Sequence, residues 1–252
     1  MHKGTVFTLI LLTAPHVIAQ WIKPAAPGVP RTADGKVNPQ GPVPRAADGK
    51  PDLSGMWFAN SKFNANLAAE FKGDVPFTAW GKALYDERRA NSSRDDPDTF
   101  CLPDGVPRIQ AAGGLPSRIV QTPAMVVILH ERGVFRQIYM DGRTLQKDFN
   151  PTWMGYSTGA WDGDTLVVKT TGFNDKTWLD DVGHPHSDAM IVTERFRRTE
   201  YGHLRLETTI EDEKAYTRPW TVTQDLRLDP NGDLLEYVCN ENEKDIQHIF
   251  GR

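Results

Sequence analysis

Apolar and polar residues alternate with a period of two along much of the second half of this 252-residue sequence. Trp220, Val222, Leu226 and Leu228 alternate with Thr221, Thr223, Asp225 and Arg227, and Leu204, Leu206 and Ile210 alternate with Arg205, Glu207 and Thr209. This pattern is typical of antiparallel strands with one face on a core and the other in water. The dipeptides Asp162-Gly163 and Asn231-Gly232 indicate tight hairpin turns. A long series of hairpins must close on itself or divide into two packed sheets.

About ten strands can be placed on this basis. They are 53–58, 117–121, 124–130, 134–140, 155–161, 164–171, 189–198, 204–210, 220–228 and 233–239. One short helix is predicted from about Thr78 to Ala90, because Trp80, Ala83 and Leu84 fall on one helical face. Residues 55–57 read Gly-Met-Trp, the Gly-x-Trp pattern seen at the first strand of lipocalin-like barrels. We therefore expect an all-β fold with one short helix, an antiparallel up-and-down lipocalin-like barrel, with a β-sandwich as the alternative.

The N-terminal segment is typical of a secretory signal peptide. A short basic start precedes an apolar run over residues 4–14, and Val17 and Ala19 are small residues at the −3 and −1 positions of a cleavage site. The apolar run is too short to span a bilayer as a stable helix. We expect residues 1–19 to be removed and the mature protein to be periplasmic or secreted.

Residues 20–51 are rich in Pro, Gly and Ala, and a seven-residue unit occurs twice, at Pro30–Lys36 and Pro44–Lys50. Two copies are too few for a solenoid. The segment is expected to be a linker, either a tether or an extended strap that lies on the domain. It carries few large apolar residues, so we expect the single barrel domain, residues 52–252, to fold without it.

Charge and cysteine content limit the partners and the compartment. Removal of Lys3 with the signal peptide changes the 29 basic residues to 28, against 33 acidic residues, a net charge of −5. That balance gives no basic field for nucleic acid, and no later stretch is apolar enough for membrane insertion. In an oxidising compartment Cys101 and Cys239 are expected to form a disulfide; two free thiols are the alternative.

Five sequence blocks carry a resemblance. They are Cys101–Arg108, Gly159–Val168, Thr171–Trp178, Gly183–Asp188 and Tyr237–Asn242. Together they resemble a large group of exported, β-rich proteins of soil bacteria, Acidobacteria especially, for which no activity is established. The resemblance covers roughly residues 52–250. It implies export and a β-rich domain, and it transfers no catalytic residue.

The connection from Gly172 to Asp188 is the main candidate for a functional site, because long connections in compact domains are usually functional or disordered. His184 and His186 are its central pair: in extended chain, side chains two residues apart point the same way. They could act as acid and base or hold a divalent metal. The metal would need a third ligand, and none stands at a convincing spacing. Hydrogen bonding within the loop is the structural alternative.

Further residues are assigned to this site by their chemistry. Asp188 and Tyr156 are candidate catalytic partners of the histidines, and Trp153, Asn174, Asp175, Trp178, Asp180 and Asp181 are candidate ligand-binding residues. Glu194 shares a strand face with Val192 and Phe196, so it is expected to be buried and ion-paired, with Arg218 or Arg136. No nucleotide-binding loop, dinucleotide fingerprint or zinc-protease motif is present, so no organic cofactor is expected.

Three functions are compatible with these features. The first is an exported barrel that binds a small polar or aromatic molecule, carbohydrate-derived among the candidates, and acts as a cofactor-free lyase, isomerase or hydrolase. The second is a non-catalytic protein that binds a small ligand. The third is an interaction module of the cell envelope, tethered by residues 20–51. The sequence does not indicate an oligomeric state.

Overall fold

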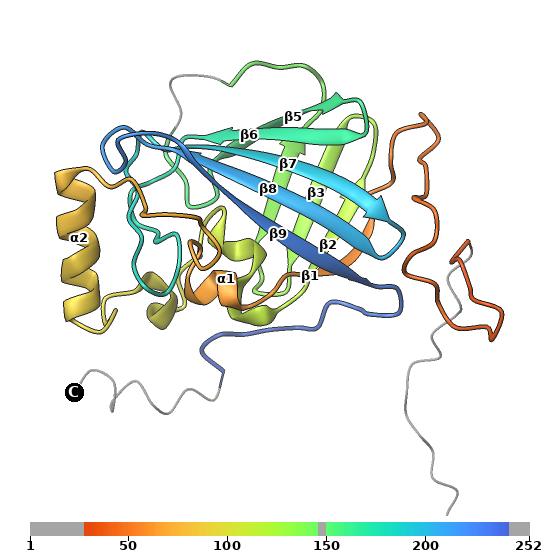
Figure 1. The fold of residues 1–252 in the computed structure, drawn as a ribbon, viewed down its shortest axis with the longest axis horizontal. Helices are drawn as coiled ribbons and strands as arrows, with labels where there is room; N and C mark the ends of the chain where they lie inside the picture. The colour runs from red at the N-terminus through yellow and green to blue at the C-terminus, as the bar shows by residue number, and fades with distance from the viewer. Residues whose placement is uncertain (1–27, 146–149, 242–252) are drawn as a thin grey trace, which may run out of the picture.

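The protein is a closed β-barrel in which strands follow one another in sequence order (Figure 1). The computed structural model describes residues 28–145 and 150–241, so the expected signal peptide lies outside the described residues. The nine strands are β1 (Gly55–Phe58), β2 (Ser117–Gln121), β3 (Met125–His130), β4 (Phe135–Tyr139), β5 (Tyr156–Asp162), β6 (Thr165–Thr171), β7 (Ile191–Glu200), β8 (His203–Glu211) and β9 (Trp220–Asp229). β1 pairs with both β2 and β9 and so closes the barrel. The predicted barrel is confirmed, and the β-sandwich alternative is wrong.

The parity of the strand number has a consequence for the topology. Nine strands that alternate in direction cannot close without one parallel pair, and β4 and β5 form it. A parallel pair needs a crossover connection rather than a tight hairpin. After β4 the chain comes back beside the same strand, so that Ser157 of β5 pairs with Ile138.

The expected tenth strand, 233–239, is wrong. These residues are described without regular structure, and Leu235 and Val238 are exposed. The pairing of β1 with β9 leaves no free sheet edge for another strand. The segment instead runs outside the barrel, where Arg118 of β2 pairs with Asp233 at 2.8 Å.

The expected helix is present as α2 (Ala79–Ala90). The Thr78 hydroxyl accepts a hydrogen bond from the Gly81 amide and caps its start. The expectation of a single helix is wrong, because a four-residue helix α1 (Lys62–Ala65) precedes it and three 3₁₀ turns follow. The 3₁₀ turns are Pro97–Phe100, Arg108–Gln110 and Ala112–Gly114.

Two apolar clusters fill the barrel from opposite ends. One combines barrel residues such as Ile210 and Trp220 with residues of the loops that cover that end, such as Leu179 and Val106. We call it the loop-end cluster. The other consists of Leu53, two residues before β1, and of residues from the strands. Its members are Leu53, Trp57, Ile119, Val126, Ile128, Ile138, Leu166, Val168, Phe196, Leu204, Leu206 and Leu226. We call it the strap-end cluster.

Residues 28–51 lie along the outside of the barrel, and we call them the strap (Figure 1). The two copies of the repeated unit form equivalent turns, closed by bridges between Arg31 and Val37 and between Arg45 and Pro51. The strap contacts the β7–β8 turn, where Tyr201 N–H donates to the Gly41 carbonyl at 2.8 Å. Of the two forms expected for this part of the linker, the structure shows the strap.

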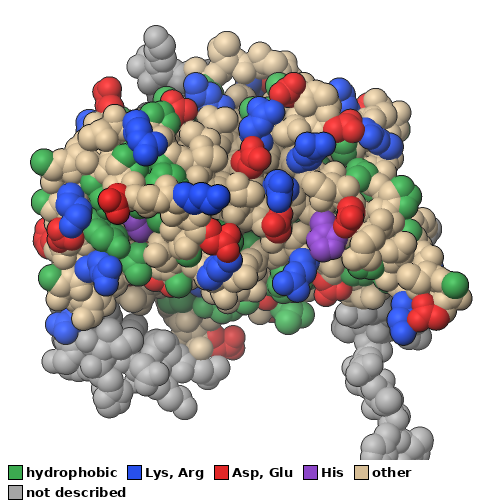
Figure 2. Space-filling model, viewed as in Figure 1, with side chains coloured by type: hydrophobic (Ala, Val, Ile, Leu, Met, Phe, Trp, Pro, Cys, Tyr) green, Lys and Arg blue, Asp and Glu red, His purple; other side chains and the backbone are tan. Residues whose placement is uncertain are grey.

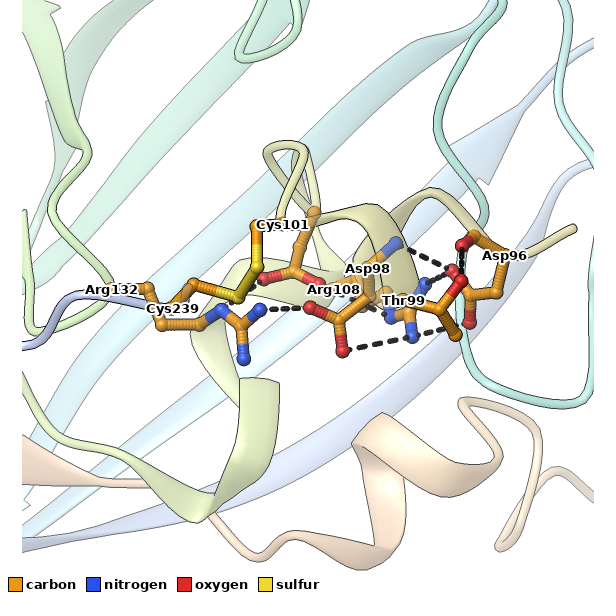
Figure 3. The surroundings of a disulfide bond; sticks show 8 residues. Asp96, Asp98, Thr99, Cys101, Arg108, Arg132 and Cys239 are labelled. Atoms are coloured by element: carbon orange, nitrogen blue, oxygen red, sulfur yellow. Dashed lines mark hydrogen bonds and ion pairs between the residues drawn. A yellow bond between two sulfur atoms is a disulfide. The ribbon is translucent and has the colours of Figure 1, made fainter. Parts of the chain in front are cut away.

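Cys101 and Cys239 form a disulfide with a Cα–Cα distance of 5.7 Å, as predicted. It joins the segment that follows β9 to the turn at residues 97–102 (Figure 3). In the chain-entropy model, closure of so long a loop stabilises the fold by about 5 kcal/mol. The disulfide is compatible with an exported protein.

The surface carries charges of both signs. On the face shown in Figure 2, basic and acidic side chains are interspersed rather than separated into single-sign patches. Within residues 28–145 and 150–241, no helix is long and apolar enough to cross a membrane.

Candidate functional site

The loop 172–188 is a packed cover on one end of the barrel. Phe173, Trp178 and Leu179 are buried, and Phe173 and Leu179 belong to the loop-end cluster. The Tyr216 hydroxyl donates to the Pro185 carbonyl at 2.7 Å and fixes the loop to the segment between β8 and β9. The Arg88 guanidinium of α2 lies 4.4 Å from the centre of the Trp178 ring.

His184 is held by Asp180 inside an aromatic enclosure. Its Nδ1 lies 2.5 Å from Asp180 Oδ2, and its backbone N–H donates to Asp180 Oδ1 at 3.0 Å. The imidazole stacks on Phe77 and contacts the rings of Tyr85 and Trp220. Its exposed fraction is 2 %.

His186 has different partners. Its Nδ1 donates to the Ser187 carbonyl at 3.0 Å, which leaves Nε2 to accept from the Thr177 hydroxyl at 2.5 Å. Burial lowers the pKa of His186, so the neutral imidazole is the stable form. Both ring nitrogens therefore serve hydrogen bonds within the protein.

Asp180 and Asp181 of the loop also have structural partners. Asp180 accepts from the Leu67 N–H at 2.7 Å in addition to His184. Asp181 pairs with Arg108 at 2.5 Å. Arg108 is buried and also binds Asp96 through two hydrogen bonds, beside the disulfide (Figure 3). Together these contacts tie the loop to the segment that follows α1 and to the 3₁₀ turns.

The remaining predicted residues differ in exposure and in bonding partners. Asp188 is exposed and pairs with Lys214 at 2.6 Å. The Tyr156 hydroxyl donates to the Asn150 carbonyl at 3.0 Å. Trp153 and Asn174 are half-buried, and Asp175 is exposed. Among the described residues no three His, Cys, Asp or Glu side chains form a group that could hold a metal ion, so the histidine pair has no third ligand there.

A different set of side chains converges inside the barrel. Eight of the nine strands, all except β1, each direct a buried polar residue toward the middle of the barrel, and β7 has a second one, Arg198, nearer its end. The eight residues toward the middle, which we call the polar layer, are Ser117, His130, Arg136, Ser157, Thr170, Glu194, Thr208 and Gln224. On β7, β8 and β9 the layer residue is flanked on one side by the loop-end cluster and on the other by the strap-end cluster. The layer thus crosses the barrel between two apolar regions.

Arg136 is the centre of the bonded half of this layer. Its guanidinium pairs with Glu194 at 2.5 Å and donates to Ser157 at 3.0 Å and to Thr170 at 2.7 Å. The expected burial of Glu194 is confirmed, and Arg136 rather than Arg218 is its partner. A buried carboxylate paired in this way keeps the net charge of the layer near zero.

His130 forms the next part of the layer. Its Nδ1 lies 2.7 Å from the Ser117 hydroxyl on the neighbouring strand. Burial, with the nearby positive charge of Arg136 as the second cause, lowers the pKa of His130 to about 3. The side chain is therefore a neutral imidazole, able to donate or accept through Nε2.

Four polar atoms of the layer have no hydrogen-bond partner within the described part of the chain. They are His130 Nε2, Glu194 Oε1, Thr208 Oγ1 and Gln224 Oε1. Each such atom costs about 1–3 kcal/mol when it is buried without a partner. Four of them would cost much of the 5–15 kcal/mol that typically stabilises a domain. Buried polar atoms of this kind are commonly satisfied by internal water or by another polar molecule.

The sequence carried a signal for this layer that the prediction used only at Glu194. Alternation places Gln224 on the same face as Val222 and Leu226, and Thr208 on the same face as Leu206 and Ile210. A polar residue that interrupts an inward-facing apolar series marks such a position. The signal does not show which interruptions meet, because that depends on the strand registers.

Fold and interior together define a closed nine-stranded barrel protein with a polar layer between two apolar clusters. No protein-family model matches the chain, and no curated protein or solved structure matches it significantly.

Proposed function

We propose that this protein binds a small, uncharged polar molecule inside its barrel, at the polar layer, and acts outside the cytoplasm. The observation that carries the proposal is the set of four buried polar atoms, from β3, β7, β8 and β9, that lack protein partners among the described residues. The disulfide, compatible with export, supports the compartment.

The free atoms indicate the chemistry of the ligand. Glu194 Oε1 and Gln224 Oε1 are acceptors, and the Thr208 hydroxyl can accept or donate. These atoms favour a ligand that offers hydroxyl or amide donors. Since Arg136 and Glu194 already neutralise each other, a charged ligand would enter the interior without a counter-charge, at high cost. Polyols, small carbohydrate-derived molecules and amides fit these requirements.

Binding rather than catalysis is the function that the geometry favours. Both imidazoles of the loop are buried and form hydrogen bonds with Asp180, Thr177 and Ser187, so their ring nitrogens are already occupied. The hypothesis that His184 and His186 act as acid and base stays a prediction. The hypothesis of an envelope interaction module also stays a prediction.

Thr208→Val tests the proposal, because it removes one unpartnered hydroxyl at nearly constant volume. The protein is screened by thermal shift and saturation-transfer NMR against small polyols, monosaccharides and amides, with amines and carboxylic acids for comparison. We expect uncharged members to bind and Thr208→Val to weaken their binding at least 10-fold. Without ligand, the variant should be as stable as the parent or up to about 1 kcal/mol more stable, since a buried unpartnered group is lost.

Thr209→Val is the matched control. Thr209 is the next residue of β8, on the outer face, where its hydroxyl bonds Thr221 at 2.8 Å. This variant should bind the ligand as the parent does. If no member of the panel binds and Thr208→Val changes stability alone, the layer holds water only and the proposal fails.

A further inference from the structure

The pairing of β4 with β5 is the shortest in the barrel. Ile138 pairs with Ser157, and Tyr139 with Thr158, whereas each of the other pairings contains at least three residue pairs. It is also the parallel pair, and parallel pairs are slightly less stable per residue. Of all the strand pairs, this one therefore has the fewest paired residues to separate when two strands part.

Packed side chains close both ends of the barrel. The loop-end cluster includes Phe173, Leu179 and Trp220, which are 0 %, 1 % and 2 % exposed. At the other end Trp57 and Leu53 are fully buried in the strap-end cluster. A molecule moving along the barrel axis would have to displace a close-packed apolar layer. The side of the barrel is the route with less obstruction.

A surface depression of about 660 Å³ lies over the β4–β5 pairing. Its described lining includes Tyr139, Arg143, Tyr156, Ser157 and Thr158. The Arg143 guanidinium stacks 3.8 Å from the centre of the Tyr139 ring, so the rim combines polar groups with an aromatic face. Rims of this kind suit hydroxyl-bearing molecules.

Ser157 connects this depression with the interior. It lines the depression, and its buried hydroxyl lies 3.0 Å from Arg136 Nε and 2.9 Å from Thr170 Oγ1 in the polar layer. The outer surface and the polar layer are therefore separated at this point by the thickness of the sheet alone.

We propose that the depression over β4 and β5 is the entrance through which a small uncharged polar ligand reaches the polar layer, by parting of these two strands. This inference rests on the proposed function and adds the route. It assigns Tyr139, Arg143 and Tyr156 to the first encounter with the ligand, and Ser157 and Arg136 to the passage inward.

Thiol labelling can test the route. Thr208→Cys places one reporter thiol in the polar layer on β8, and the described cysteines are both in the disulfide. The probe is methyl methanethiosulfonate, a small uncharged thiol reagent. We expect labelling at least 10-fold faster than global unfolding of the same variant. Adding Thr158→Trp, which fills the depression from the outer face of β5, should slow labelling at least 10-fold.

Thr221→Trp is the matched control, because Thr221 is an exposed threonine on the outer face of β9. It should leave the labelling rate unchanged. Circular dichroism and the melting temperature of each variant verify folding. If Thr158→Trp does not fold, Thr144→Trp narrows the same depression from the connection after β4 and replaces it.

The outcomes separate the two proposals. Fast labelling that Thr158→Trp does not slow would overturn the entrance and leave binding in the interior untouched. Labelling no faster than global unfolding would mean that the interior is closed to small molecules, and it would overturn both.

Discussion

At the scale of single residues, the structure changes what substitution of the two loop histidines should do. His186 uses both ring nitrogens in hydrogen bonds, and His184 is bound to Asp180 within aromatic rings. Asn or Gln cannot reproduce both contacts of an imidazole. We expect His184→Asn and His186→Asn each to lower the free energy of unfolding by about 1–3 kcal/mol, because buried partners are left unpaired. Urea unfolding measures this.

His203→Asn is the control for this pair. His203 begins β8 and is about one-third exposed, so its replacement should change the free energy of unfolding by less than about 0.5 kcal/mol. Unchanged stability of both loop variants would contradict the structural role and return the pair to consideration as an acid–base centre.

For single residues, part of the site could be predicted from the sequence. The burial of Glu194 followed from alternation along one strand, and Arg136 was one of two partners considered. The surroundings of His184 could not be predicted, because Phe77 and Tyr85, which contact it, lie about one hundred residues earlier, just before and within α2. Local pattern identifies inward positions, whereas contacts between distant segments depend on the full topology.

At the scale of elements, the contacts of the strap add a change in stability to the expectation that the domain folds without this segment. Tyr201 N–H and Gly202 N–H donate to the carbonyls of Gly41 and Pro39, each at 2.8 Å. Deletion of residues 20–50 removes both acceptors, each worth about 1 kcal/mol. We expect a folded domain with a melting temperature lower by about 4–8 °C, since 1 kcal/mol corresponds to about 2–4 °C at this size. Differential scanning calorimetry measures the shift.

Arg45→Ala provides a narrower comparison for the deletion. Arg45 pairs with Asp164 at 2.6 Å, but both side chains are about half exposed, so the melting temperature of Arg45→Ala should stay close to that of the parent. A deletion variant that melts at the parental temperature would show that the strap rests on the barrel without stabilising it.

Strand number illustrates why elements were predicted better than their arrangement. Nine of the ten expected strands exist, because alternation is a local property of half-buried chain. The segment 233–239 has apolar residues, but it finds no free strand to pair with, because β1 and β9 already close the barrel. The parallel pairing of β4 with β5 follows from an odd number of strands. An expectation of ten strands allows every pair to be antiparallel, so it does not predict the parallel pair.

At the scale of the whole molecule, the barrel places a polar layer without net charge between two apolar clusters. The clusters provide most of the stabilisation through burial of apolar surface. The layer interrupts that burial on eight strands and holds an ion pair and a neutral histidine in its place. Apolar side chains at these positions would pack without unpartnered atoms, so the layer is a cost in stability that a ligand can offset.

The neutral state of His130 predicts how global stability depends on pH. Its pKa is about 3 in the folded protein, and an unfolded chain has an ordinary histidine pKa near 6.5. Below about pH 6.5 the unfolded state binds a proton that the folded state does not, so stability is complete above that pH and is lost as the pH falls toward 3. His130 alone should remove about 3 kcal/mol between pH 6.5 and 4. Urea unfolding of the parent and of His130→Gln across this range measures the difference, in which all other groups cancel. Between pH 6.5 and 4 the free energy of unfolding of His130→Gln should fall by about 3 kcal/mol less than that of the parent. The control His203→Gln should lose as much stability as the parent. If the profiles of the parent and His130→Gln ran parallel, the layer would admit a charged imidazole.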